Sequence, residues 1–218
     1  MSGLRNRRAW QWFWVAALTA AMIVPSLAPA ARAQSSDQKE LHIQQSLFPD
    51  VIDPQVGSAL AEISIFTLNY EGLTRLDDKL QTVPGAAESW DFNDDLTQIT
   101  FHLRDGLKYS DGSPLTAKDF AYAAERTCDP NVAGGYQYIL SDIVVGCADL
   151  AGLNTAGEGT PAAIDPDAYA KAKAALGVKA LDDQTLQVSL TAPAPYFPTI
   201  ASLWVFDPVK EDLVTAGG

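Results

Sequence analysis

Residues 102–120, "HLRDGLKYSDGSPLTAKDF", place three aspartates and two glycines between two apolar runs. The Asp-Gly pairs at 105–106 and 111–112 are typical of tight turns, because glycine adopts the left-handed backbone that many such turns need. Thr116, followed three residues later by Asp119, matches a capping box in which Asp replaces the usual Glu. We therefore predict that this charged stretch forms two turns and a helix start, and that it is scaffold and not an active site.

Outward from this stretch, the apolar spacing predicts a mixture of strands and helices. Ile99, Phe101 and Leu103 alternate with polar residues, as in a half-buried strand. The first Asp-Gly turn is expected to close this strand against 107–109 as a hairpin, and Gly72 to cap a helix in the left-handed conformation. The remaining predicted elements are strands at 41–47, a hairpin over 178–190, a turn of helix before Trp90, and helices over 58–70, from 116 onward and over 165–176.

The first 33 residues have the features of a cleaved secretory signal. Arginines precede an apolar run over 12–24, and residues 31–33 read Ala-Arg-Ala, with small residues where signal peptidase cleaves. An uncleaved anchor is the alternative, but Pro25 and Pro29 interrupt the run before the roughly 20 residues that a span needs. No cysteine lies directly after the run to carry a lipid anchor. We expect a periplasmic or extracellular protein.

The charge of the exported chain argues against polyanionic partners. Removing the four arginines of the first 33 residues leaves 11 basic and 27 acidic residues, a formal charge of −16. Such a surface repels nucleic acid and anionic lipid.

Cys128 and Cys147 are the two cysteines of the sequence. In an oxidising compartment we expect them to form a disulfide that closes about 20 residues and stabilises the fold by about 3 kcal/mol. Two separate buried thiols are the alternative. Because no histidine lies near them in the sequence, the cysteines make a poor zinc site, and we expect no metal and no cofactor.

The sequence contains none of the common catalytic motifs. Its two histidines, His42 and His102, fall on the polar faces of predicted strands. There is no His-Glu-x-x-His, no Gly-x-Ser-x-Gly and no phosphate-binding loop. The acidic residues at 91–95 lack the spacing and the final glutamate of a calcium loop. These absences disfavour an enzyme.

Aromatic residues are more informative than the charged ones. Tyr136 and Tyr138 fall in an irregular segment between the cysteines, and Trp204 and Phe206 follow a proline-rich stretch. Aromatic side chains on irregular backbone offer apolar area with a polar tip, which is typical of binding clefts. Packing into the local core is the alternative, and the sequence does not decide between the two.

Residues 69–126, "NYEGLTRLDDKLQTVPGAAESWDFNDDLTQITFHLRDGLKYSDGSPLTAKDFAYAAER", resemble the signature of the extracellular solute-binding proteins of ABC importers, of the peptide/nickel/opine-binding type (family 5). The later "TLQVSLTAPAPYF" at 185–197 matches as well. The resemblance implies an α/β, two-lobed, periplasmic-binding-protein-like fold of class II. It further implies that a second lobe follows Gly218, so that the chain is an N-terminal part of such a protein.

The resemblance also implies how the chain is divided. After the signal peptide at 1–33, residues 34–72 form the first segment of lobe one, residues 73–180 form an inserted small subdomain, and residues 181–218 return to lobe one. Because a hinged protein closes only on a ligand that both lobes contact, this part alone is expected to bind weakly or not at all.

A ligand site without catalytic residues is implied on three segments: the one after "IDP", the loop after the subdomain helix, and the one after "APYF". The residues at these places are Val56, Gly57, Ser58, Tyr136, Tyr138, Trp204 and Phe206. Some oligopeptide binders place an acid in the first segment to hold the amino terminus of the peptide. This chain has none there, which argues against an ammonium partner at that place.

The function implied is a non-enzymatic, monomeric binding component that captures peptides or a similar small solute and delivers it to an ABC permease. A nickel-chelate, opine or oligosaccharide binder on the same fold is the alternative within transport. A secreted hydrolase and a sensor domain are alternatives from other classes, and the missing nucleophile and base disfavour the hydrolase.

Overall fold

The computed structural model describes residues 42–45, 47–132, 134–153 and 164–216. The chain divides into two compact units, Met1–Gln44 and Gln45–Gly218, and the fold described below is that of the second. The predicted signal peptide at 1–33 lies outside the described residues. Within the described ranges, no helix combines the length and the apolar character that crossing a bilayer requires.

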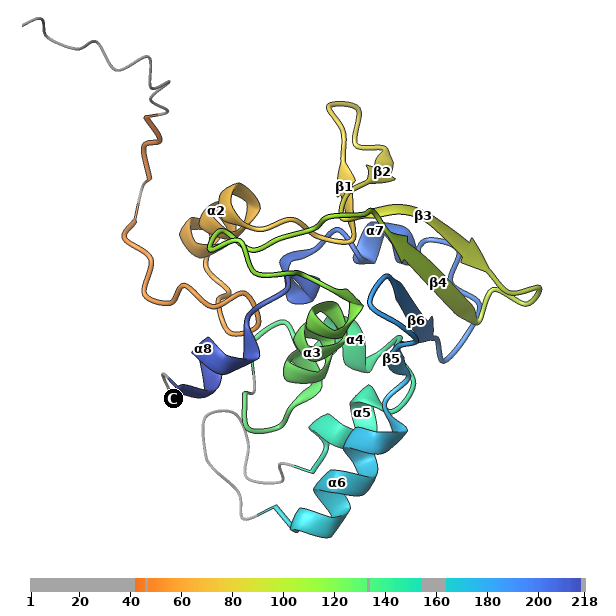
Figure 1. Cartoon of the computed structure of the whole chain (residues 1–218). Helices are drawn as coiled ribbons and strands as arrows, with labels where there is room; N and C mark the ends of the chain where they lie inside the picture. Colours follow the sequence, from red (N-terminus) through yellow and green to blue (C-terminus); the bar gives the residue numbers. More distant parts are fainter. Residues whose placement is uncertain (1–41, 46, 133, 154–163, 217–218) are drawn as a thin grey trace, which may run out of the picture. The chain divides into compact units, whose positions relative to one another are not determined.

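The second unit is built of short strands and helices (Figure 1). The strands are β1 (Thr74–Leu76), β2 (Thr82–Pro84), β3 (Ala87–Phe92), β4 (Gln98–Leu103), β5 (Val178–Ala180) and β6 (Thr185–Ser189). The helices are α2 (Leu60–Asn69), α3 (Ala117–Cys128), α4 (Tyr138–Ser141), α5 (Cys147–Ala151), α6 (Pro166–Ala175), α7 (Phe197–Ile200), the 3-10 helix η1 (Trp204–Phe206) and α8 (Glu211–Ala216). The helices predicted over 58–70, from 116 onward and over 165–176 are confirmed, as is the hairpin within 178–190.

One antiparallel sheet, in the order β3-β4-β6-β5, carries the core, and β1 pairs with β2 in a separate hairpin. Side chains alternate across each strand, so Ile99, Phe101 and Leu103 of β4 share one face, and all three are buried. Phe101 lies opposite Leu186 of β6, which is buried on the same face. Phe120 of α3 belongs to the same cluster, so α3 covers this face of the sheet.

The start of α3 and the two turns before it have the predicted chemistry. The backbone N–H and the hydroxyl of Thr116 donate to the Asp119 carboxylate, at 2.7 and 2.9 Å. Gly106 and Gly112 have φ of +73° and +87°, which residues with a side chain rarely adopt. The turn and capping predictions for this stretch are confirmed.

The hairpin predicted between β4 and residues 107–109 is wrong. β4 already has β3 and β6 on its two edges, so no edge is left for a third neighbour. Residues 107–109 pair instead with 113–115 around the second turn, where the Tyr109 N–H donates to the Ser113 carbonyl at 2.9 Å.

Three other local predictions are also wrong. The turn of helix expected before Trp90 is strand β3, because β4 supplies it with a hydrogen-bonding partner. Residues 42–45 and 47, the described part of the predicted strand 41–47, have no strand structure, since alternation stabilises a strand only beside another one. Gly72 is not left-handed; instead, a Cβ atom there would lie 3.3 Å from the carbonyl oxygen of Ala201, so glycine permits a close approach.

The predicted boundary between residues 180 and 181 falls inside the β5–β6 hairpin. Val178 of β5 lies opposite Val188 of β6, and β6 also pairs with β4 along its other edge. The strand predicted to return to lobe one therefore shares a sheet with strands of the predicted subdomain. The division into 34–72, 73–180 and 181–218 stays a prediction.

Candidate functional site

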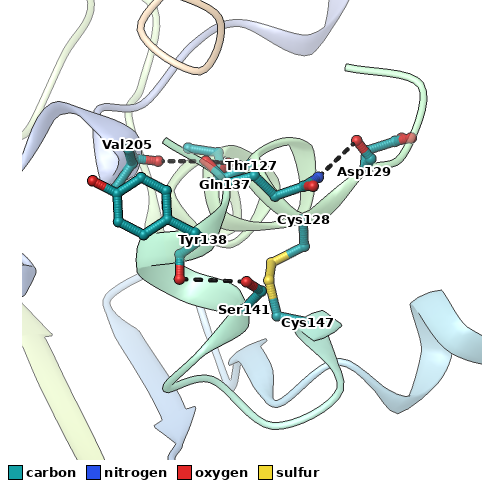
Figure 2. Close-up of a disulfide and its surroundings, with 9 residues drawn as sticks. Thr127, Cys128, Asp129, Gln137, Tyr138, Ser141, Cys147 and Val205 are labelled. Carbon is teal, nitrogen blue, oxygen red and sulfur yellow. Dashed lines mark hydrogen bonds between the residues drawn. A yellow bond between two sulfur atoms is a disulfide. The ribbon is translucent and has the colours of Figure 1, made fainter. Parts of the chain in front are cut away.

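A disulfide brackets the irregular segment that carries the two predicted tyrosines (Figure 2). Cys128 ends α3 and Cys147 begins α5, and their Cα atoms lie 5.1 Å apart, which confirms the predicted pairing. Between them, the Gln137 side-chain amide donates to the Asp129 carbonyl at 3.3 Å. The described residues between the cysteines, 129–132 and 134–146, are therefore joined to α3 at one end and to the start of α5 at the other.

Three side chains form a continuous surface of rings, which we call the aromatic surface: Tyr136, Tyr138 and Trp204. The ring of Tyr136 meets Trp204 edge-on at 4.8 Å between centroids and stacks on Tyr138 at 5.8 Å. Tyr138 is 57% exposed, whereas Tyr136 and Trp204 are half-buried. The Trp204 indole Nε1 is buried and has no hydrogen-bond partner among the described atoms. The structure thus brings together two segments that lie 66 residues or more apart in the sequence.

The segment after "IDP", residues 56–58, lies against the segment that carries Tyr136. The Asp53 carbonyl accepts hydrogen bonds from the N–H groups of Val56 and Gly57, at 3.1 and 2.8 Å, which folds the turn. Gly57 is buried against the Phe66 ring, and Ser58 is exposed. A Cβ atom at Gly135 would lie 3.4 Å from the Ser58 Cβ, so the two backbones run close together. The first two predicted segments therefore adjoin.

Phe206 differs from the other predicted residues. Its ring is fully buried and meets Phe197 edge-on at 5.8 Å, inside the hydrophobic core. In this structure Phe206 exposes no surface to a ligand. Of the two alternatives that the sequence left open, a binding cleft and the local core, Phe206 packs into the core.

The aromatic surface contains no ionisable group other than the tyrosine hydroxyls, and the buried charges near it are paired or neutralised. Arg126, 7% exposed, lies 2.8 Å from the Asp53 carboxylate. Burial works to lower the pKa of Arg126, but the hydrogen bond and the charge of Asp53 hold it above its ordinary value. Asp207 is 5% exposed, and burial raises its pKa to about 8. Among the described residues, no three potential metal ligands gather.

A groove of about 1120 Å³ is lined by Ile52, Asp53 and Pro54, by the end of α2, and by residues within 104–111 and 208–214. None of the seven predicted site residues lines it. Arg104, at the edge of the groove, forms a bidentate salt bridge in which Nη1 and Nη2 donate to the Glu71 carboxylate oxygens at 2.8 and 2.6 Å. The Lys210 ammonium lies 2.6 Å from the Asp111 carboxylate. Each of these two cations has a carboxylate partner, whereas Lys108, which also lines the groove, has no salt bridge among the described residues.

Sequence reasoning missed the residues that hold the site together. Arg126 and Gln55 join the turn after "IDP" to α3, and the Thr127 hydroxyl donates to the Val205 carbonyl of η1 at 2.8 Å (Figure 2). These contacts span 71 to 78 residues, and no local pattern signals them. The one signal of these contacts in the sequence is a charged residue, Arg126, on the apolar side of α3.

Comparison with known proteins identifies the family. Residues 81–217 match the family model described as "Bacterial extracellular solute-binding proteins, family 5 Middle". The chain is 40% identical over 146 residues to the periplasmic oligopeptide-binding protein OppA of Escherichia coli (strain K12), an alignment that covers 67% of this chain and 24% of that protein. It is 30% identical over 213 residues to the probable deoxycholate-binding periplasmic protein YgiS of the same strain, covering 94% of this chain and 36% of that protein.

Solved structures give the same result for the fold. OppA of Listeria monocytogenes bound to peptide superposes with a TM-score of 0.68 at 28% identity, over 80% of this chain and 31% of that one. The chain therefore spans about a quarter to a third of the length of these relatives. The neighbours are two-lobed peptide-binding proteins, and the mixed α/β structure is consistent with part of that fold.

Proposed function

This chain belongs to the bacterial extracellular solute-binding proteins, family 5, and from that membership we propose that the protein is the substrate-binding component of an ABC importer. It captures peptides in the periplasm or outside the cell and delivers them to the permease, without chemical change to the ligand. The names of the relatives, which include oligopeptide, dipeptide and murein peptide binders, support peptides as the ligand class.

The aromatic surface is the structural observation that supports peptide binding within this proposal. Tyr138 exposes 57% of its area beside two half-buried rings, and Ser58 is exposed on the adjoining turn. Aromatic rings supply contact area at low cost in conformational entropy, and tyrosine hydroxyl groups add hydrogen bonds to a peptide backbone. The surface suits the neutral part of a peptide, either its backbone or an apolar side chain.

Capture without catalysis requires enclosure. In the two-lobed arrangement that the family implies, this surface forms one wall, and closure of a second lobe supplies the other. Only a ligand that stabilises the closed state more than the open one shifts such an equilibrium. We therefore propose that affinity depends on contacts from both lobes, and that the aromatic surface contributes a part of it.

A second candidate is a neutral, ring-bearing solute such as an oligosaccharide. The absence of charge on the aromatic surface favours it, because stacked rings recognise sugars as well as apolar side chains. One relative is named as a probable deoxycholate binder, so family members are associated with ligands other than peptides.

The test is a ligand screen on the protein encoded by the complete reading frame, produced from residue 34 onward. Tri-alanine, Ala-Phe-Ala and maltotriose are added in a thermal-shift assay. A ligand present at 100 times its Kd stabilises the folded protein by about 2.7 kcal/mol, which raises the melting temperature measurably. We expect a shift with a peptide and recovery of the intact peptide by mass spectrometry. A protein that responds to none of the peptides, or that cleaves them, contradicts the proposal.

A matched pair of variants locates the ligand. Tyr138 and Tyr196 are 57% and 58% exposed, but only Tyr138 belongs to the aromatic surface. Tyr138→Ser is expected to weaken peptide binding several-fold, and Tyr196→Ser to leave it unchanged. Equal effects of the two substitutions contradict the assignment of the site.

A further inference from the structure

Arg126 is a buried cation at the end of α3, two residues before the disulfide. Its side chain is 9% exposed, and it lies in the last turn of the helix. A buried guanidinium is costly unless its donors are satisfied, so its partners show what it holds in place.

The guanidinium of Arg126 binds two residues of the turn after "IDP". Nη1 and Nη2 donate to the two carboxylate oxygens of Asp53, at 2.9 and 2.8 Å, and Nη1 also donates to the Gln55 Oε1 at 2.5 Å. The same Asp53 accepts the Gln55 backbone N–H at 3.0 Å. One planar fork thus fixes the carboxylate and the amide that begin the turn leading to Ser58.

Gln55 also joins the turn to the residue after η1 through a hydrogen bond. Its side-chain Nε2 donates to the Asp207 carbonyl at 3.0 Å, directly after the helix that carries Trp204. The backbone of Gly134 lies against Gln55 so closely that any Cβ atom at Gly134 would overlap the Gln55 carbonyl oxygen. Gln55 therefore contacts the segments on both sides of the aromatic surface, and Arg126 holds Gln55.

We propose that Arg126, acting through Gln55, is the positioning residue of the ligand site, which holds the turn at 56–58, the Tyr136 segment and Trp204 in one binding arrangement. This inference rests on the proposed function, because it assigns a role toward the same ligand. Arg126 does not touch the ligand itself. Lysine does not replace it, since a single ammonium group cannot bind both carboxylate oxygens and the amide in one plane.

Arg126→Lys and Gln55→Met test the proposal, with Arg104→Lys as the control. Arg104 forms the same two-bond pair, with Glu71, but lies away from the aromatic surface. Gln55→Met removes the bridging amide and keeps the Arg126–Asp53 pair, so it decides the matter if Arg126→Lys does not fold. Affinity for Ala-Phe-Ala is measured by calorimetry on the protein from the complete reading frame, well below each melting temperature, together with the ¹H–¹⁵N signal of the Trp204 indole.

We expect Arg126→Lys and Gln55→Met each to weaken binding about tenfold or more and to move the Trp204 indole signal, while Arg104→Lys changes affinity less than twofold and leaves that signal in place. Wild-type affinity in both Arg126→Lys and Gln55→Met overturns the inference. If the wild-type protein binds no peptide, the proposed function fails instead. The indole signal then decides separately, because an unmoved signal in both variants refutes positioning by Arg126.

Discussion

Asp207 offers a direct test of the electrostatics of this fold, through the substitution Asp207→Asn. The residue follows η1, is 5% exposed, and a Cβ atom at Gly72 would lie 3.5 Å from its Oδ1. Burial raises the pKa of its carboxyl group from 3.8 to about 8, so at pH 7 the folded protein holds it mostly protonated. Asparagine has nearly the same shape and no charge to desolvate.

The direction in which stability changes with pH follows from comparing the Asp207 carboxyl group in the unfolded and the folded protein. In the unfolded chain the carboxyl group ionises near pH 4, whereas in the folded protein it resists ionisation up to about pH 8. At low pH this group therefore does not destabilise the folded state. As pH rises from about 4 to about 8 the folded state loses stability, and above about pH 8 it loses no more. At about 1.36 kcal/mol per pH unit, roughly 4 kcal/mol is lost between pH 4 and pH 7.

Urea unfolding of wild type and Asp207→Asn at pH 4.5, 7 and 9 measures the effect. The variant is expected to be more stable than wild type by several kcal/mol at pH 9, by less at pH 7, and by little at pH 4.5. Asp94→Asn, at an exposed turn position, serves as the control and should follow wild type at every pH. Parallel stability curves for wild type and Asp207→Asn contradict this prediction, because they mean that Asp207 ionises alike in the folded and unfolded states.

Two further substitutions and the reduction of the disulfide test the scaffold. Phe120→Ala removes a fully buried ring of the core and should lower the free energy of unfolding by about 3–5 kcal/mol in urea, and a loss below about 1 kcal/mol contradicts its central position. Thr116→Ala removes the hydroxyl that bonds Asp119 and should cost about 0.5–2 kcal/mol, seen as a lower melting temperature; an unchanged value means that the cap contributes nothing. Reducing the Cys128–Cys147 bond, with a separation of 19 residues, should cost about 3 kcal/mol, and dithiothreitol should leave a Cys128→Ser, Cys147→Ser double variant unaffected. An oxidised protein whose stability does not respond to dithiothreitol contradicts that last estimate.

Local patterns predicted the elements whose stability is mainly local. The alternation at 98–103 and the capping pair at Thr116 and Asp119 appear in the structure as expected, because pleat and cap chemistry act over a few residues. Strand β3 was missed because "AESWDF" has little alternation of its own and is stabilised by pairing with β4. The same dependence on a neighbour explains why the alternation did not produce a strand at residues 42–45 and 47, the described part of that stretch.

The site was predictable in part for the same reason. Tyr136, Tyr138 and Trp204 stood out by residue type and by their irregular surroundings, and the structure places their rings together. Arg126 and Asp53 did not stand out, since their contact joins positions 73 residues apart and depends on how α3 packs. Sequence thus indicated the groups that could contact a ligand, and only the fold showed what positions them.

A crystal structure of the protein from the complete reading frame with Ala-Phe-Ala bound would show where the ligand lies. We expect an intact peptide in van der Waals contact with the rings of Tyr136, Tyr138 and Trp204, beside Ser58. A peptide bound elsewhere, for example in the groove beside Arg104, or found cleaved, contradicts this expectation.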